Sequence, residues 1–216
     1  VMHMTRGFGL AILSLLFIGS VAIAGSFIFR GEGNVPSDLK GIALSKPVPL
    51  DRQTFASTNS EAVFPIPSRT KWTFLVVGYA HCPDICPFIL GNLAEVEAHM
   101  MKSVAQAELP RFVFLSVDPQ RDTPDFLKEY VKHFSDRLVG MTGDADAIDR
   151  LTRQIGAFYR LGEPDTEGFY PVDHSGEIFL IDPTGRLFAK FKPPIDAEET
   201  VDRFLGLVEH FRVTQL

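Results

Sequence analysis

Two cysteines stand four positions apart in the segment His81-Cys82-Pro83-Asp84-Ile85-Cys86-Pro87, and the sequence contains no others. A thiolate both attacks disulfides and binds metals, so the pair could serve redox chemistry or metal binding. Two thiolates also form a soft ligand pair that suits Cu(I), and zinc less selectively. The flanking prolines argue against a pair of purely structural thiols in a regular element. The segment therefore predicts a metal site or a redox pair.

The spacing of the two cysteines, together with a distant histidine, helps to distinguish a metal site from a redox pair. Redox enzymes of the thioredoxin type carry two residues between their cysteines, whereas this chain carries three. The wider spacing can still close a disulfide. His174, in Asp173-His174-Ser175-Gly176, is a candidate third ligand, because its loop should lie at the same end of the sheet as Cys82. Four other histidines, downstream of the N-terminal segment, are expected at the surface or at helix ends: His81, His99, His133 and His210.

The elements around the cysteines should place them at the start of a helix. Residues 72–79 form an apolar run with β-branched and aromatic side chains, which predicts a central strand buried on both faces. Residues 88–101 have the spacing of an amphipathic helix. Free N–H groups at a helix N-terminus stabilise negative charge, so we expect both thiol pKa values to be lowered.

The rest of the domain alternates strands with helices, which indicates an α/β sandwich with a central mixed sheet. Ligand sites in such sheets lie beyond the carboxyl ends of the strands, where the cysteines also fall. Thr123 and Asp144 are suited to cap two of the helices. The expected strands are residues 111–117, 138–141, 177–182 and 186–191, and the expected helices begin at 123, 144 and 196.

The N-terminal segment predicts a membrane anchor. Residues 7–29 carry no charged side chain, and about 20 apolar residues are enough to span a bilayer as a helix. A cleaved signal peptide is the alternative, with Ala22-Ile23-Ala24 as its cleavage site. We expect an anchor over residues 1–30, a linker over 31–43 and the globular domain over 44–216. The charges beside the segment place that domain outside the cytoplasm, facing the periplasm or an equivalent exported side.

The net charge of the chain and the compartment expected for its domain exclude some functions and constrain the state of the cysteines. The net charge of −6 argues against a nucleic-acid-binding protein, which would need a basic surface. An exported compartment oxidises exposed thiols, so Cys82 and Cys86 must be protected, recycled by a reductant or bound to metal.

Three segments together resemble the Sco/SenC family of copper proteins: residues 78–87, 116–124 and 172–185, in the family's order. The resemblance implies a thioredoxin-like fold and a role in assembling the dinuclear copper site of cytochrome c oxidase subunit II. It also implies that Cys82, Cys86 and His174 bind one copper ion, Cu(I) or Cu(II). The partner would be subunit II or another copper chaperone.

Other positions match the family less fully. Asp118 and Asp122 correspond to its acidic positions near the site, where they could meet a partner or serve as helix caps and turn formers. Residues 44–71 match the family's usual N-terminal hairpin poorly, and Phe88 stands where a more polar residue is expected. These departures bear on the choice of partner more than on copper binding.

Two functions compete on these residues. A copper metallochaperone would bind and transfer the ion without catalytic turnover. A thiol–disulfide oxidoreductase would use the same dithiol to reduce the acceptor's cysteines. Thioredoxin-like enzymes resemble this chain at residues 179–182 but carry a cis-proline shortly before that strand, where Gly176 stands here. This departure, with the wide cysteine spacing and His174, favours copper. A peroxidase is a weaker third candidate.

Overall fold

Strand β4 (Thr73–Gly78) forms the centre of the domain in the computed structural model, which describes residues 35–58, 61–65, 68, 70–105 and 108–215. All six residues of β4 are buried, as the apolar run predicts. The strand pairs in parallel with β5 (Arg111–Ser116) and antiparallel with β9 (Ile178–Ile181), and β5 pairs in parallel with β6 (Leu138–Thr142). The sheet is therefore mixed, with its β-branched and aromatic centre covered on both faces.

The complete sheet has eight strands in the order β1-β10-β9-β4-β5-β6-β2-β3. Strand β1 (Ala43–Pro49) pairs with β10 (Arg186–Phe191) at one edge, and β2 (Gln53–Ser57) and β3 (Glu61–Phe64) close the other. Strands β1, β2 and β3, which precede the first strand expected from the sequence, thus lie at the two edges of the sheet. The β2–β3 hairpin forms because Phe55 and Phe64 are buried against each other edge to face, with ring centroids 6.4 Å apart.

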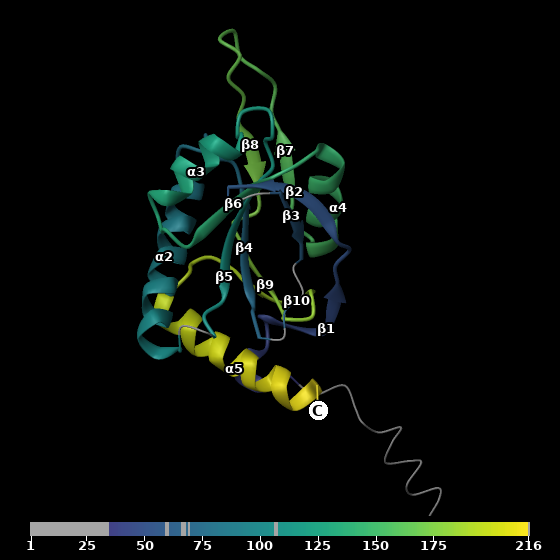
Figure 1. Ribbon diagram of the computed structural model, residues 1–216, viewed down its shortest axis with the longest axis vertical. Helices are drawn as coiled ribbons and strands as arrows, with labels where there is room; N and C mark the ends of the chain where they lie inside the picture. The colour runs from purple at the N-terminus through teal and green to yellow at the C-terminus, as the bar shows by residue number, and fades with distance from the viewer. Residues whose placement is uncertain (1–34, 59–60, 66–67, 69, 106–107, 216) are drawn as a thin grey trace, which may run out of the picture. The chain divides into compact units, whose positions relative to one another are not determined.

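Helices cover the sheet on both sides (Figure 1). Helices α2 (Ile85–Ser103) and α3 (Pro124–Lys132) lie on one side, and α4 (Ala145–Ile155) lies on the other. The two predicted caps are confirmed: Thr123 accepts the Phe126 N–H at 3.3 Å and Asp144 accepts the Ala147 N–H at 2.7 Å. The last helix, α5 (Ala197–Gln215), contacts α2 and the short 3-10 helix η1 (Ser37–Leu39).

Helix α2 begins three residues earlier than its apolar spacing predicts. Asp84 occupies the N-cap position, so Cys86 lies within the first turn and Pro87 at the third helical position. Proline is tolerated there because the first N–H groups of a helix have no partner inside the helix. The cysteines therefore straddle the helix start, with Cys82 before it and Cys86 in it.

Strands β7 (Tyr159–Leu161) and β8 (Val172–His174) form a separate two-stranded sheet. Tyr159 is opposite His174 in this antiparallel pair, and the Ser175 N–H donates to the Phe158 carbonyl at 2.9 Å. Strand β8 contacts β4, so the small sheet brings His174 to the carboxyl end of the central strand.

The predicted α/β sandwich with a central mixed sheet is confirmed. The predicted anchor at residues 7–29 lies outside the described residues. Within the part of the chain that the structure describes, no helix is both long and apolar enough to cross a membrane.

Candidate metal centre

Cys82, Cys86 and His174 converge on one point. Their ligand atoms all lie within 4.8 Å of one another, and Cys86 Sγ is 3.1 Å from His174 Nε2. Cys86 is fully buried and Cys82 is 8% exposed. Among the described residues this is the only group of three or more histidine, cysteine or acidic side chains placed to share an ion. The structure thus brings together the three residues that the sequence singles out.

The backbone at the end of β4 and the start of α2 determines where the two sulfurs lie. The Cys82 N–H donates to the Tyr79 carbonyl at 3.2 Å, which reverses the chain, and the Cys86 N–H points to Cys82 Sγ at 3.5 Å. Gly78 makes room for them, because a β-carbon on it would lie 2.3 Å from Cys86 Sγ and 3.0 Å from Phe114 Cε2. Sequence reasoning missed Gly78 as a site residue, although a glycine in a strand often marks a close approach.

The imidazole of His174 is oriented for a ligand role. Its Nδ1–H donates to the Ser175 carbonyl at 3.1 Å, which leaves the Nε2 lone pair facing Cys86. Burial lowers the pKa of His174 and so favours the neutral ring that a metal requires. The Tyr79 ring meets the imidazole edge to face, with centroids 5.8 Å apart.

The expected lowering of both thiol pKa values is wrong for Cys86. Burial raises the pKa of the Cys86 thiol far above its ordinary value, and the neighbouring Cys82 raises it further. The reason is desolvation, which penalises the thiolate more than the helix N-terminus stabilises it. Without metal, Cys86 is therefore a protonated thiol at neutral pH, and a metal must displace that proton to bind.

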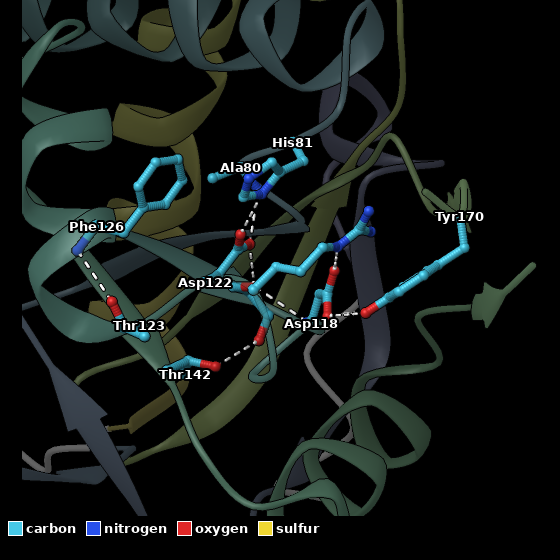
Figure 2. Close-up of polar contacts among 10 residues, drawn as sticks. Ala80, His81, Asp118, Asp122, Thr123, Phe126, Thr142 and Tyr170 are labelled. Carbon is cyan, nitrogen blue, oxygen red and sulfur yellow. Dashed lines mark hydrogen bonds and ion pairs between the residues drawn. The ribbon is translucent and has the colours of Figure 1, made fainter. Parts of the chain in front are cut away.

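Asp122 fixes the residues that lead into Cys82. Its buried carboxylate accepts the Ala80 N–H at 2.7 Å, the Ser116 hydroxyl at 2.5 Å and the His81 ring N–H at 2.9 Å (Figure 2). The capping role open to Asp122 in the sequence falls instead to Thr123. His81 bonds to Asp122 and stacks on Phe126, with ring centroids 4.9 Å apart, so it does not join the sulfurs.

Asp118 ties the loop after β5 to the β7–β8 hairpin. It pairs with Arg121 Nε and accepts the Tyr170 hydroxyl at 2.8 Å. The Arg121 guanidinium lies 3.7 Å from the centre of the Tyr170 ring, a cation–π distance. Figure 2 shows Tyr170 reaching Asp118 from the hairpin. Tyr170 lies outside the three sequence segments that indicate the site, so the sequence offered no signal for this contact.

Two thiols and one imidazole at the carboxyl ends of the strands of a thioredoxin-like sheet define a thioredoxin-like protein with a site for one soft or borderline metal ion. The sequence profile of the SCO1/SenC family matches residues 52–209. The chain belongs to the SCO1/SenC family, which confirms the resemblance drawn from its three segments.

Relatives support this assignment. A mitochondrial SCO2 homolog of Bos taurus is 37% identical over 146 residues, which cover 67% of this chain and 54% of that protein. The SCO2-like protein RP587 of Rickettsia prowazekii is 31% identical over 175 residues, covering 81% and 80%. The chain spans about half the length of the mitochondrial relatives that it matches.

Solved structures agree with the fold. Arabidopsis thaliana ScoI with copper bound matches with a TM-score of 0.64 and 30% identity, over 75% of this chain and 97% of that one. Bradyrhizobium japonicum ScoI with copper bound matches with a TM-score of 0.62 and 29% identity, over 76% and 98%.

Proposed function

We propose that this protein is a metallochaperone that holds one copper ion with Cys82, Cys86 and His174. It delivers the ion to the dinuclear copper site of cytochrome c oxidase subunit II. The observation that carries the proposal is the ligand group itself, whose two sulfurs and one imidazole nitrogen lie within 4.8 Å of one another. Relatives solved with copper bound support the choice of copper over zinc.

The three ligands have different roles. Two thiolates alone satisfy Cu(I), whereas Cu(II) prefers an additional nitrogen ligand, which His174 Nε2 supplies. Copper is the cargo, and it leaves by ligand exchange: an acceptor sulfur binds the ion as a donor sulfur is released. The raised pKa of Cys86 assists this step, because the freed sulfur takes up a proton and no longer competes for the ion.

The place of action follows from the N-terminal segment. We propose that residues 7–29 anchor the protein in a membrane and that the domain faces the periplasm or the equivalent exported side. An oxidase copper site that is assembled outside the cytoplasm would then be within reach of the domain.

A thiol–disulfide oxidoreductase is the second candidate, and the closeness of the two sulfurs favours it. In this role the Cys82–Cys86 dithiol would pass two electrons and two protons to a disulfide of the acceptor and become a disulfide itself. The acceptor cysteines would then be free to bind copper. His174 has no part in that reaction, which separates the two candidates.

The test is complementation of a deletion strain. Under the metallochaperone proposal, oxidase activity falls in the deletion and added copper partly restores it. The wild-type gene restores activity, whereas Cys82→Ser, Cys86→Ser and His174→Ala do not. Full restoration by His174→Ala, which keeps the dithiol, would overturn copper delivery and support the reductase.

A further inference from the structure

Five large apolar side chains are exposed on the segments that carry or touch the metal ligands. We call them the apolar rim, and each is between 42% and 60% exposed: Ile85, Phe88, Phe126, Phe158 and Phe169. A single exposed apolar residue needs no explanation, but several around one functional site indicate an interaction surface.

Two members of the rim lie on the first turn of α2, beside Cys86. Ile85 and Phe88 are three positions apart, so they occupy the same exposed face of the helix. A β-carbon on Gly176 would lie 3.7 Å from Ile85 Cδ1, so this face adjoins the segment that follows His174. The two ligand-bearing segments are thus bordered by one apolar surface.

The other members continue the rim around the site. Phe126 stacks on His81, the residue before Cys82 (Figure 2). Phe158 accepts the Ser175 backbone N–H at its carbonyl and donates its own N–H to the Ser175 hydroxyl oxygen, and Ser175 is the residue after His174. The Phe169 ring lies 5.6 Å from the Arg121 guanidinium, which also covers Tyr170. All five side chains therefore lie on segments that carry the proposed ligands or contact residues around them.

Exposed carboxylates accompany the rim. Asp84 stands between the cysteines and Asp125 next to Phe126, and the loop of the β7–β8 hairpin adds Glu163 and Glu167. The nearby cation Arg160 is paired with Asp173 at 2.6 Å, and Lys128 stands on α3 one turn beyond Asp125. The balance of charge around the rim is acidic, which suits a basic partner surface.

The burial of the ligands requires contact at this surface. Cys86 is fully buried and Cys82 nearly so, so an acceptor sulfur in solution cannot reach an ion between them from a distance. An acceptor must cover the rim and exclude its water to bring its own sulfur to the ion. Apolar side chains at the centre and charges at the edge are the usual anatomy of such an interface.

We propose that the apolar rim is the docking surface for the copper acceptor, a protein with a thiol-bearing metal loop surrounded by apolar and basic side chains. The proposal rests on the proposed function, because it names the contact through which delivery takes place. Phe88, which departs from the expected polar residue, is one of the central contacts.

The test measures docking and transfer separately. Copper-loaded full-length protein in detergent is mixed with reduced apo-subunit II of cytochrome c oxidase, and binding and the transfer rate are both recorded. Phe88→Ser with Phe126→Ser should weaken binding and slow transfer about tenfold or more at low protein concentration, as loss of interface anchors does. Copper affinity should stay within about twofold, because both side chains are exposed and neither belongs to the ligand group.

The matched controls are Met101→Ser and Val213→Ser, which remove exposed apolar side chains from the last turns of α2 and α5. They should bind and transfer like the wild type. Equal binding and transfer by the rim variants would overturn the rim alone. If the wild type binds subunit II but transfers no copper, and the rim variants do not bind, then copper delivery is overturned and the docking role of the rim is kept. Failure of the wild type to bind subunit II would overturn both.

A charge test checks the chemistry of the partner. Association of the wild type should slow as salt is raised from about 10 mM to 150 mM, since screening weakens attraction between exposed charges. Glu163→Gln with Glu167→Gln should reduce that dependence. A rate that does not change with salt would overturn the basic character of the acceptor surface.

Discussion

Gly78 and Cys86 are in such close contact that a β-carbon on the glycine would lie 2.3 Å from the cysteine sulfur. Real β-carbons do not approach other atoms this closely, so any side chain at position 78 must displace Cys86 Sγ or the backbone of β4. The carboxyl end of the central strand therefore has a glycine because Cys86 Sγ occupies the space above it.

Gly78→Ala should accordingly lower both stability and copper binding. Overpacking of a well-packed core costs about 1–3 kcal/mol, and displacement of Cys86 separates it from His174. Urea unfolding and copper titration measure the two effects. Gly91→Ala is the matched control, because a β-carbon there meets nothing within 4 Å and should stabilise α2 by about 0.5–1 kcal/mol. Unchanged copper binding in Gly78→Ala would contradict the crowding argument.

His174→Ala should lose Cu(II) but keep Cu(I). The two thiolates that remain satisfy the softer ion, whereas the divalent ion loses its nitrogen ligand. Copper content and the visible absorption of the Cu(II) form are the measurements, with exposed His99→Ala as the control. An unchanged Cu(II) spectrum would remove His174 from the site.

Oxidation and copper binding should exclude each other, because both use the sulfurs of Cys82 and Cys86. Protein oxidised to the disulfide should take up no copper tightly until a reductant is added. Metal analysis after gel filtration of the oxidised and reduced forms measures this. Stoichiometric copper in the oxidised form, with the same spectrum, would show that the cysteines are not ligands.

Asp122→Asn should destabilise the domain and weaken Cu(II) binding. The Asp122 carboxylate accepts hydrogen bonds from Ala80, Ser116 and His81, and the amide NH₂ of asparagine would face at least one of these donors without being able to accept from it. A buried group that loses its hydrogen bond costs about 1–3 kcal/mol. The segment before Cys82 would lose its support. Exposed Asp136→Asn is the control, and urea unfolding with Cu(II) titration is the assay. Equal stability of the two variants would refute the role given to Asp122.

Sequence patterns predicted the central part of this fold because its signals are local. The apolar run of β4, the caps Thr123 and Asp144, and the strands β9 and β10 each depend on a few adjacent residues. The edge hairpin was missed because the burial of Phe55 and Phe64 depends on the packing of the whole fold, which no local pattern reveals.

The sequence could single out Cys82, Cys86 and His174 as candidate ligands because cysteines and a histidine carry chemistry that few other residues can supply. The environment of these three residues could not be predicted from the sequence. Burial of Cys86 outweighs the helix N-terminus and raises its pKa, and only packing reveals this. The contact between Tyr170 and Asp118 likewise joins segments that share no sequence pattern.

The origin of the ligands in two separate sheets divides the site into two parts with different mechanical support. Cys82 lies in the turn after β4 and Cys86 in the first turn of α2, so both sulfurs belong to the eight-stranded sheet and its covering helix. The imidazole comes from a two-stranded ribbon of three-residue strands. Local opening of that ribbon would withdraw the nitrogen while the dithiol stays folded, because short strands outside the main sheet are among the first segments to open. Such an opening would take His174 away from the two sulfurs without global unfolding.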